Sequence, residues 1–283
     1  MPFNDFLLFQ GYSARMNNRS KTLGFLGLAA LLLAGCGGPG PSIMPDSGRL
    51  SGQRPGHFKE SEAIKIAKDL PVHGVDVSKY QGDVDWMAVA NGGVNFAYIK
   101  ATEGGDRLDP KFFRNWHGAK AAGLPRGAYH FVYWCRPWHE NMSWFEQHVP
   151  REPDALPPVL DVEATPTSTT CPRRLEKEPT LREIKAMLVE MERFYGKKPI
   201  IYTTVDFYEA MFSDGEMSEY PMWIRSTKHH PAVRYGNRPW HFWQYQSDAW
   251  VHGIPTRVDR NAFYGDEKDW RNWLQNNTFA AAR

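Results

Sequence analysis

The heptapeptide PPVLDVE, residues 157–163, places two carboxylic acids, Asp161 and Glu163, one residue apart after an apolar pair. Val159 and Leu160 predict a buried strand, in which side chains at i and i+2 point to the same side. The two acids would then lie about 6–7 Å apart on one face. Acids this close raise each other's pKa and lower the stability of the fold. Their presence on an apolar strand therefore suggests a functional role. The spacing therefore favours acid–base chemistry.

Other acids and polar side chains also follow predicted strands. Asp76 lies near the end of a strand at 72–77, Glu103 lies just past a strand at 94–101, and Asp259 closes a short strand at 257–259. Taken singly, each has an ordinary explanation as a cap, a turn residue or an ion-pair partner. Polar or aromatic side chains near the ends of the remaining strands are Tyr129, Tyr202, Trp223 and Gln244.

The elements that must position these residues alternate along the chain. Strands are predicted at 72–77, 94–101, 126–132, 158–163, 199–203, 222–225, 241–246 and 257–259. Helices are predicted at 84–90, 110–122, 138–149, 180–195, 207–212 and 267–274. This alternation predicts a parallel sheet, and about eight strands predict an irregular (β/α) TIM-like barrel with helices missing in its second half. Catalytic groups of such barrels lie at the C-terminal ends of strands, so the acids would meet at one mouth.

A mouth lined with carboxylates suits glycoside hydrolysis, in which a protonated acid donates to the leaving oxygen and a carboxylate assists at the anomeric carbon. Ionised Asp161 and Asp259 would keep Glu163 protonated near neutral pH. Metal binding is the rival use of clustered acids. No His stands at ligand spacing with them, and the sequence has no phosphate-loop motif. We therefore expect neither a metal ion nor a cofactor.

The N-terminal segment has the pattern of an export signal. Arg19 and Lys21 precede the apolar run LGFLGLAALLL, residues 23–33, which is too short for an ordinary membrane span. The run leads into Leu-Ala-Gly-Cys, which resembles a bacterial lipoprotein signal whose Cys36 becomes lipidated. The alternative is a plain signal peptide with an incidental cysteine. Met16 is an alternative start to the first methionine.

The expected organisation is a signal at 1–36, a tether and short helix at 37–69, and a catalytic barrel at 70–283. The tether is rich in Gly, Pro and Ser. Gly37, rather than Asp, follows Cys36, and by resemblance to lipoprotein sorting in two-membrane bacteria this implies the outer membrane, facing the periplasm. The net charge of +2 gives no reason to expect a nucleic-acid partner.

Two further cysteines, Cys135 and Cys171, form an even pair in an exported chain. An oxidising compartment favours a disulfide between them, and free buried thiols are the alternative. Cys135 follows the third strand at the expected mouth, so a bridge to Cys171 would brace a loop beside the acids.

Six stretches occur in a distinctive order: GVDVSKYQGDVDW, FAYIKATEG, GAYHF, PPVLDVE, PIIYT and RVDRN. Together they resemble the lysozymes of glycoside hydrolase family 25, over about residues 72–274. The resemblance implies cleavage of the β-1,4 bond between N-acetylmuramic acid and N-acetylglucosamine in peptidoglycan. It matches Glu163 to the general acid and Asp161 to the acid that orients the substrate acetamido group. It also assigns the remaining site acids, Asp76 and Asp259, the site tyrosines, Tyr129 and Tyr202, and the groove candidates Trp223, Gln244 and Glu103.

Two mechanisms remain open for such an enzyme. In the first, which we favour, the substrate acetamido oxygen attacks the anomeric carbon and the configuration is retained. In the second, a water molecule attacks and the configuration is inverted. A chitinase-like family 18 hydrolase also ends a strand in D-x-E, but its upstream acids are replaced here by Pro157 and Val159. A non-catalytic glycan-binding lipoprotein is a further alternative. The expected partners are peptidoglycan and, through the lipid, a membrane, with the chain acting as a monomer.

Overall fold

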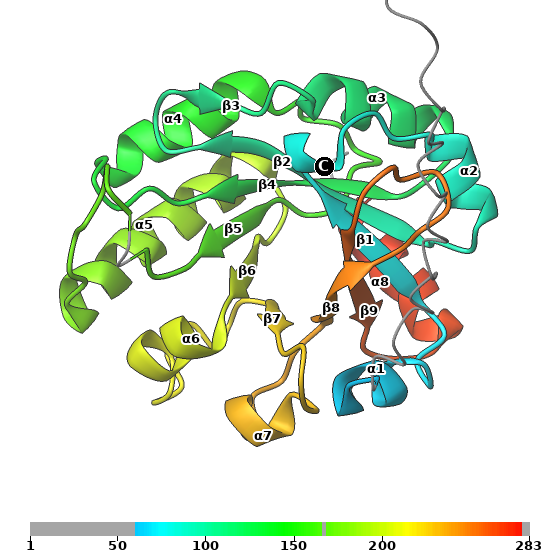
Figure 1. Ribbon diagram of the computed structural model, residues 1–283. Coiled ribbons are helices and arrows are strands. Elements are labelled where there is room, and N and C mark those ends of the chain that lie inside the picture. The colour runs from blue at the N-terminus through cyan, green and yellow to red at the C-terminus, as the bar shows by residue number, and fades with distance from the viewer. Residues whose placement is uncertain (1–59, 166–167, 279–283) are drawn as a thin grey trace, which may run out of the picture. The chain divides into compact units, whose positions relative to one another are not determined.

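The computed structural model describes residues 60–165 and 168–278. Cys36, the expected signal and the tether up to residue 59 lie outside the described residues. Eight strands form a closed ring in the order β1-β9-β8-β7-β6-β5-β4-β2, which the pairing of β1 with β2 completes (Figure 1). Their bounds are β1 His73–Val77, β2 Phe96–Glu103, β4 Arg126–Phe131, β5 Val159–Val162, β6 Ile200–Thr203, β7 Met222–Arg225, β8 Phe242–Ala249 and β9 Val258–Phe263. The predicted irregular TIM-like barrel is confirmed, and a short strand, β3 (Arg107–Leu108), is added at β2.

The last strand departs from the prediction of a parallel sheet. β9 is antiparallel to both of its neighbours, β1 and β8, whereas the other pairs in the ring are parallel. The connection at 250–257 is too short for a crossover helix and forms a hairpin instead. Asp259 consequently lies near the start of β9 and does not close it. Because the strand is reversed, this start lies at the same mouth.

The helices predicted to be missing in the second half of the barrel are reduced there, between β6 and β9. The helix bounds are α1 Glu62–Ala67, α2 Trp86–Asn91, α3 Phe112–Ala121, α4 Trp138–His148, α5 Lys177–Tyr195, α6 Val205–Met211, α7 Ala232–Tyr235 and α8 Glu267–Thr278, with a 3-10 turn, η1, at Lys79–Gln81. Of these, α6 and α7 have seven and four residues, and β8 leads into β9 without a helix. Gly196, with a φ of 64°, ends α5 in the left-handed conformation that glycine favours. Within the described ranges, none of the helices combines the length and apolarity needed to cross a bilayer.

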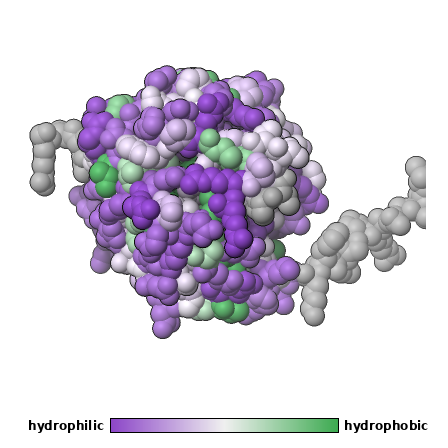
Figure 2. Space-filling model, turned by 90° about the vertical axis from the view of Figure 1, so that its left-hand side faces the viewer, coloured by the Kyte–Doolittle hydropathy of each residue, from purple (hydrophilic) through white to green (hydrophobic). Residues whose placement is uncertain are grey.

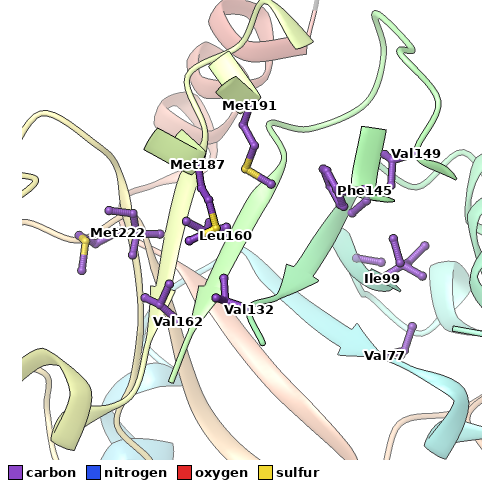
Figure 3. Packing of buried hydrophobic residues seen from close by; sticks show 14 of the residues in the cluster. Val77, Ile99, Val132, Phe145, Val149, Leu160, Val162, Met187, Met191 and Met222 are labelled. Atoms are coloured by element: carbon purple, nitrogen blue, oxygen red, sulfur yellow. The ribbon is translucent and has the colours of Figure 1, made fainter. Parts of the chain in front are cut away.

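Strand periodicity separates an outer and an inner core. Leu160 and Val162 of β5 belong to the outer cluster between strands and helices, and Leu160 lies beside Met187 of α5 (Figure 3). Val159, the first residue of β5, belongs to the inner cluster with Tyr202. Alternate residues of a strand point to opposite faces, so Asp161 and Glu163 point inward together.

The inner core fills the end of the barrel opposite the acids. Trp270 of α8 packs against Phe96 and Phe263, with ring centroids 5.3 and 5.1 Å apart. A Cβ on Gly74 would meet Phe96 at 2.3 Å, and a Cβ on Gly127 would meet Tyr98 at 2.2 Å. Only glycine therefore leaves room for these rings. Apolar side chains therefore fill the barrel interior next to the acids and exclude water from that side.

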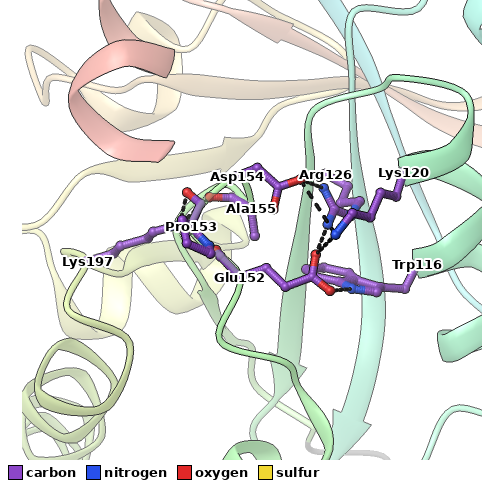
Figure 4. A network of polar contacts seen from close by, with 8 residues as sticks. All are labelled: Trp116, Lys120, Arg126, Glu152, Pro153, Asp154, Ala155 and Lys197. Carbon is purple, nitrogen blue, oxygen red and sulfur yellow. Dashed lines mark hydrogen bonds and ion pairs between the residues drawn. The ribbon is translucent and has the colours of Figure 1, made fainter. Parts of the chain in front are cut away.

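A polar network fastens the loop that leads into β5 (Figure 4). Lys197 donates hydrogen bonds to the backbone carbonyls of Glu152 and Pro153, each at 3.1 Å. The guanidinium of Arg126 is buried, and it forms ion pairs with Glu152 and, at 3.0 Å, with Asp154. These contacts fix the position at which β5 begins, and thus the height of its two acids in the barrel.

Candidate active site

The mouth of the barrel holds a cavity of about 320 Å³. The C-terminal ends of β4 and β5 point to the left in Figure 1, and Figure 2 looks from that side onto a mainly hydrophilic surface. The cavity is lined by Asp76, Ser78, Tyr80, Lys100, Tyr129, Phe131, Asp161, Glu163, Tyr202, Trp223, Arg225, Gln244 and Asp259. It thus collects the four predicted acids and four of the five other predicted residues. Glu103 is not among them; its carboxylate pairs with Lys100 Nζ at 2.9 Å and Arg107 Nη1 at 3.2 Å.

Asp76 is held by two amide side chains. Gln244 Nε2 donates to Asp76 Oδ2 at 3.0 Å, and Asn261 Nδ2 donates to the same oxygen at 2.7 Å. The amides are themselves oriented, because Tyr202 OH donates to Gln244 Oε1 at 2.9 Å and Trp223 Nε1 donates to Asn261 Oδ1 at 2.8 Å. This buried network makes Asp76 a fixed acceptor. Burial raises the pKa of Asp76 above its ordinary value, and the hydrogen bonds from Asn261 and Gln244 oppose that rise.

The segment around Glu163 is held from outside the cavity. Trp134, which is buried, donates from its indole Nε1 to the backbone carbonyl of Glu163 at 2.8 Å. The Trp134 carbonyl accepts a hydrogen bond from Arg173 Nη1 at 2.7 Å. Cys135 and Cys171 are joined by a disulfide. The loop after β4 and the loop after β5 are therefore tied together next to Glu163.

Burial dominates the electrostatics of the β5 acids. Burial raises the pKa of Asp161 well above its ordinary value, and the neighbouring Glu163 raises it further. Asp161 Oδ1 is buried, with no hydrogen-bond partner within the described residues. Burial also raises the pKa of Glu163, which the Arg225 guanidinium opposes. The direction for Glu163 agrees with the prediction from the sequence, but the cause differs: burial is the largest cause, the charge of Asp76 adds to it, and the contact with Asp161 lowers the pKa.

Asp259 also holds its proton more tightly than an ordinary aspartic acid. Burial, followed by the charge of Asp76, raises the pKa of Asp259 to about 8, and Arg225 again acts in the opposite direction. Burial therefore raises the pKa of all four acids in the cavity. A carboxyl group that keeps its proton at higher pH than usual is what glycoside hydrolysis requires of its general acid.

Comparison with known proteins identifies the family. The profile described as "Glycosyl hydrolases family 25" matches residues 75–254, more than half of the chain. The chain belongs to glycosyl hydrolase family 25. It is accordingly a glycoside hydrolase of the lysozyme type.

Relatives and solved structures agree with this membership. The family 25 chain is 32% identical over 238 residues to lysozyme M1 of Streptomyces globisporus, covering 81% of this chain and 79% of that protein. It is 36% identical over 217 residues to the uncharacterized protein YegX of Escherichia coli K12, covering 73% and 74%. A family 25 glycosyl hydrolase structure from Bacillus anthracis superposes with a TM-score of 0.67 at 34% identity, covering 72% of this chain and 94% of that one.

Arg225 and Asn261 are among the polar residues of this family 25 site that sequence reasoning missed, together with Ser78, Tyr80 and Lys100. Arg225 lines the cavity two positions after Trp223, and Asn261 holds Asp76 two positions after Asp259. The same period of two that linked Asp161 with Glu163 would have found both. In the described part of the hydrolase, no three His, Cys, Asp or Glu side chains are grouped so as to hold a metal ion.

Proposed function

We propose that this family 25 hydrolase cleaves the β-1,4 bond between N-acetylmuramic acid and N-acetylglucosamine in peptidoglycan. The observation that carries the proposal is the presence of Asp161 and Glu163, both with raised pKa values, in one cavity beside the anchored Asp76. The similarity to lysozyme M1 supports this class of substrate.

In the proposed reaction Glu163 is the general acid. It donates its proton to the leaving oxygen as the glycosidic bond breaks, and it later removes a proton from the attacking water. Asp161 accepts a hydrogen bond from the acetamido N–H while the acetamido oxygen attacks the anomeric carbon. This N–H would favour the ionised form of Asp161, whose Oδ1 the described residues leave without a partner. Direct attack by water, with inversion, is the alternative route.

The remaining acids support this chemistry from the opposite wall. Asp76, when ionised, would place negative charge near the positive charge that develops at the anomeric carbon, whereas Asp259 would keep its proton up to about pH 8. Four further residues of the cavity would contact the sugar rings or hold groups that do so: Tyr129, Tyr202, Trp223 and Gln244. Of the predicted groove residues, Glu103 has the weakest case, because its carboxylate is engaged by Lys100 and Arg107.

We also propose that the barrel acts from a membrane. Lipid on Cys36 and the tether up to residue 69 would hold a monomeric enzyme at the outer membrane, facing the periplasm and beside its polymer. The sequence order of charge, apolar run and Leu-Ala-Gly-Cys supports this placement. The test is lipid labelling in cells that express either the parent chain or Cys36→Ser. A labelled variant, or an unlabelled parent chain, would argue against the anchor.

The decisive experiment digests purified peptidoglycan with the protein, with Glu163→Gln and with Glu103→Gln, an acid outside the cavity. The products are reduced with borohydride, and mass spectrometry identifies the reduced sugar. We expect reduced muramic acid ends, a loss of about 10²–10⁴-fold in Glu163→Gln, and a far smaller change in Glu103→Gln.

The other outcomes separate the alternatives. Reduced glucosamine ends would place cleavage at the other bond and contradict the proposal. Binding to peptidoglycan without release of fragments would support the non-catalytic lipoprotein instead.

A further inference from the structure

Two exposed aromatic side chains lie on neighbouring loops, Tyr80 at the mouth and Trp250 beside a separate hollow that Tyr245 and Arg260 also line. Tyr80, in η1, lines the cavity and is 72% exposed. Trp250, the first residue after β8, is 64% exposed. Large apolar surface that is left in water at the edge of a binding site commonly marks an interaction surface. The mechanism above uses neither ring.

Hydrogen bonds fasten the two loops that carry these rings. Gln81 Nε2 donates to the backbone carbonyl of Arg257 at 3.2 Å, and Thr256 Oγ1 donates to the carbonyl of Tyr80 at 3.4 Å. The hairpin at 250–257, orange in Figure 1, also lies beside α2, because its Gly253 carbonyl accepts from the backbone N–H of Asp85 at 2.8 Å. The loops at 79–81 and 250–257, which carry the two rings, therefore form one continuous surface, called the ledge below.

Each ring has a cation against it. The Arg257 guanidinium lies 4.4 Å from the Trp250 ring centroid, and Lys79 Nζ lies 5.2 Å from that of Tyr80. The contact with Arg257 helps to fix the orientation of the indole. Within the described ranges, neither cation pairs with a carboxylate. The ledge is thus both aromatic and positively charged.

We propose that Tyr80 and Trp250 form a platform on which sugar rings of a peptidoglycan strand stack beyond the bond that is cleaved. The apolar faces of pyranose rings pack on aromatic faces, and a strand that leaves the cavity past Tyr80 passes onto the ledge. The carboxylates of stem peptides complement Lys79 and Arg257. The inference rests on the proposed function and extends it to a preference for long strands.

The test compares Trp250→Ala with Tyr264→Ala. Tyr264 is 61% exposed, follows β9 at the opposite end of the barrel, and contacts Trp240. For each protein, kcat/KM is measured on long glycan strands and on the shortest fragment that is cleaved. We expect the long-to-short ratio to fall about tenfold in Trp250→Ala and to stay at the parent value in Tyr264→Ala, while Trp250→Phe recovers most of it.

An unchanged ratio in Trp250→Ala, or an equal fall in Tyr264→Ala, would overturn the platform. If the parent protein releases no fragments, the proposed function fails, and the platform is judged by binding alone. In that case cosedimentation with insoluble peptidoglycan is compared in a Glu163→Gln background, with and without Trp250→Ala. Weaker sedimentation of the Trp250→Ala protein would support the platform, and equal sedimentation would refute it.

Discussion

Asp76 and Asp259 lie directly opposite each other on the antiparallel strands β1 and β9. Directly opposed residues of an antiparallel pair present their side chains on the same face, and both acids line the cavity. Asp76 accepts hydrogen bonds from Gln244 and Asn261, whereas within the described residues no hydrogen bond reaches the Asp259 side chain. The pair is therefore unequal: burial raises the pKa of both acids, but hydrogen bonds oppose the rise at Asp76 and not at Asp259.

Asp259→Asn is expected to stabilise the fold at alkaline pH. The pKa of Asp259 rises from 3.8 to about 8 in the folded state, so between these values the folded chain binds more protons than the unfolded chain. Stability therefore falls as pH rises through this window. At about pH 8 the variant should unfold with a free energy higher by about 1 kcal/mol or more, allowing for solvent screening, and the gain should shrink toward pH 4.

Denaturant unfolding across this pH range measures the effect. Asp248→Asn, a change of an exposed acid that is near Asp259, is the matched control and should show a much smaller gain. A gain in Asp259→Asn that does not vary with pH would contradict the assignment of the raised pKa.

Arg225 is expected to set the alkaline limb of activity. Its charge lowers the pKa of Glu163 against the effect of burial. If Glu163 must be protonated to donate, activity is lost as pH rises through its pKa. Arg225→Met should raise that pKa and move the alkaline limb of the pH profile of kcat/KM upward by about one unit.

The matched variant for this test is Arg225→Lys, which keeps the charge. Its alkaline limb should stay near that of the parent. If Arg225→Met and Arg225→Lys show the same alkaline limb in the pH profile of kcat/KM, the charge of Arg225 does not set the pKa of Glu163.

Asn261→Leu is expected to damage both stability and catalysis. The change removes a donor to Asp76 and the acceptor of the buried Trp223 indole. Leaving these groups unpaired costs about 1–3 kcal/mol of unfolding free energy, and the pKa of Asp76 should rise because a stabilising hydrogen bond is lost. Denaturant unfolding and kcat measurements check this, with Gln147→Leu, at an exposed amide of α4, as the control. An Asn261→Leu protein with parental kcat would show that the network does not position Asp76.

Local patterns were enough to predict most of the fold. The strand β7 at 222–225 was predicted to the residue, and the helix at 180–195 was predicted within three residues of its start, because both have clear hydrophobic periodicity and defined ends. The sequence patterns did not predict β3, η1 and α7, because elements of two to four residues are too short to show a hydrophobic period.

Strand direction and desolvation could not be read from short patterns. The alternation around Asp259 is the same for a strand that runs either way, so only the pairing of β9 with β1 and β8 reveals that the strand is reversed. The pKa of Glu163 was assigned in the right direction but from the wrong neighbour, because the contact with Asp161 lowers it. The larger cause, burial, depends on how the whole barrel closes around the side chain.

The reversed β9 has a further consequence for how this enzyme could diversify. A hairpin is closed by its own antiparallel pairing and needs no helix to return the chain, although Val251 and Ile254 of this one are buried in the outer core. Loop closure changes little in free energy when a few residues are added, so insertions at exposed positions of the hairpin, such as His252, would leave the fold intact. This segment is therefore the place where descendants could exchange one polymer for another while keeping the acids unchanged.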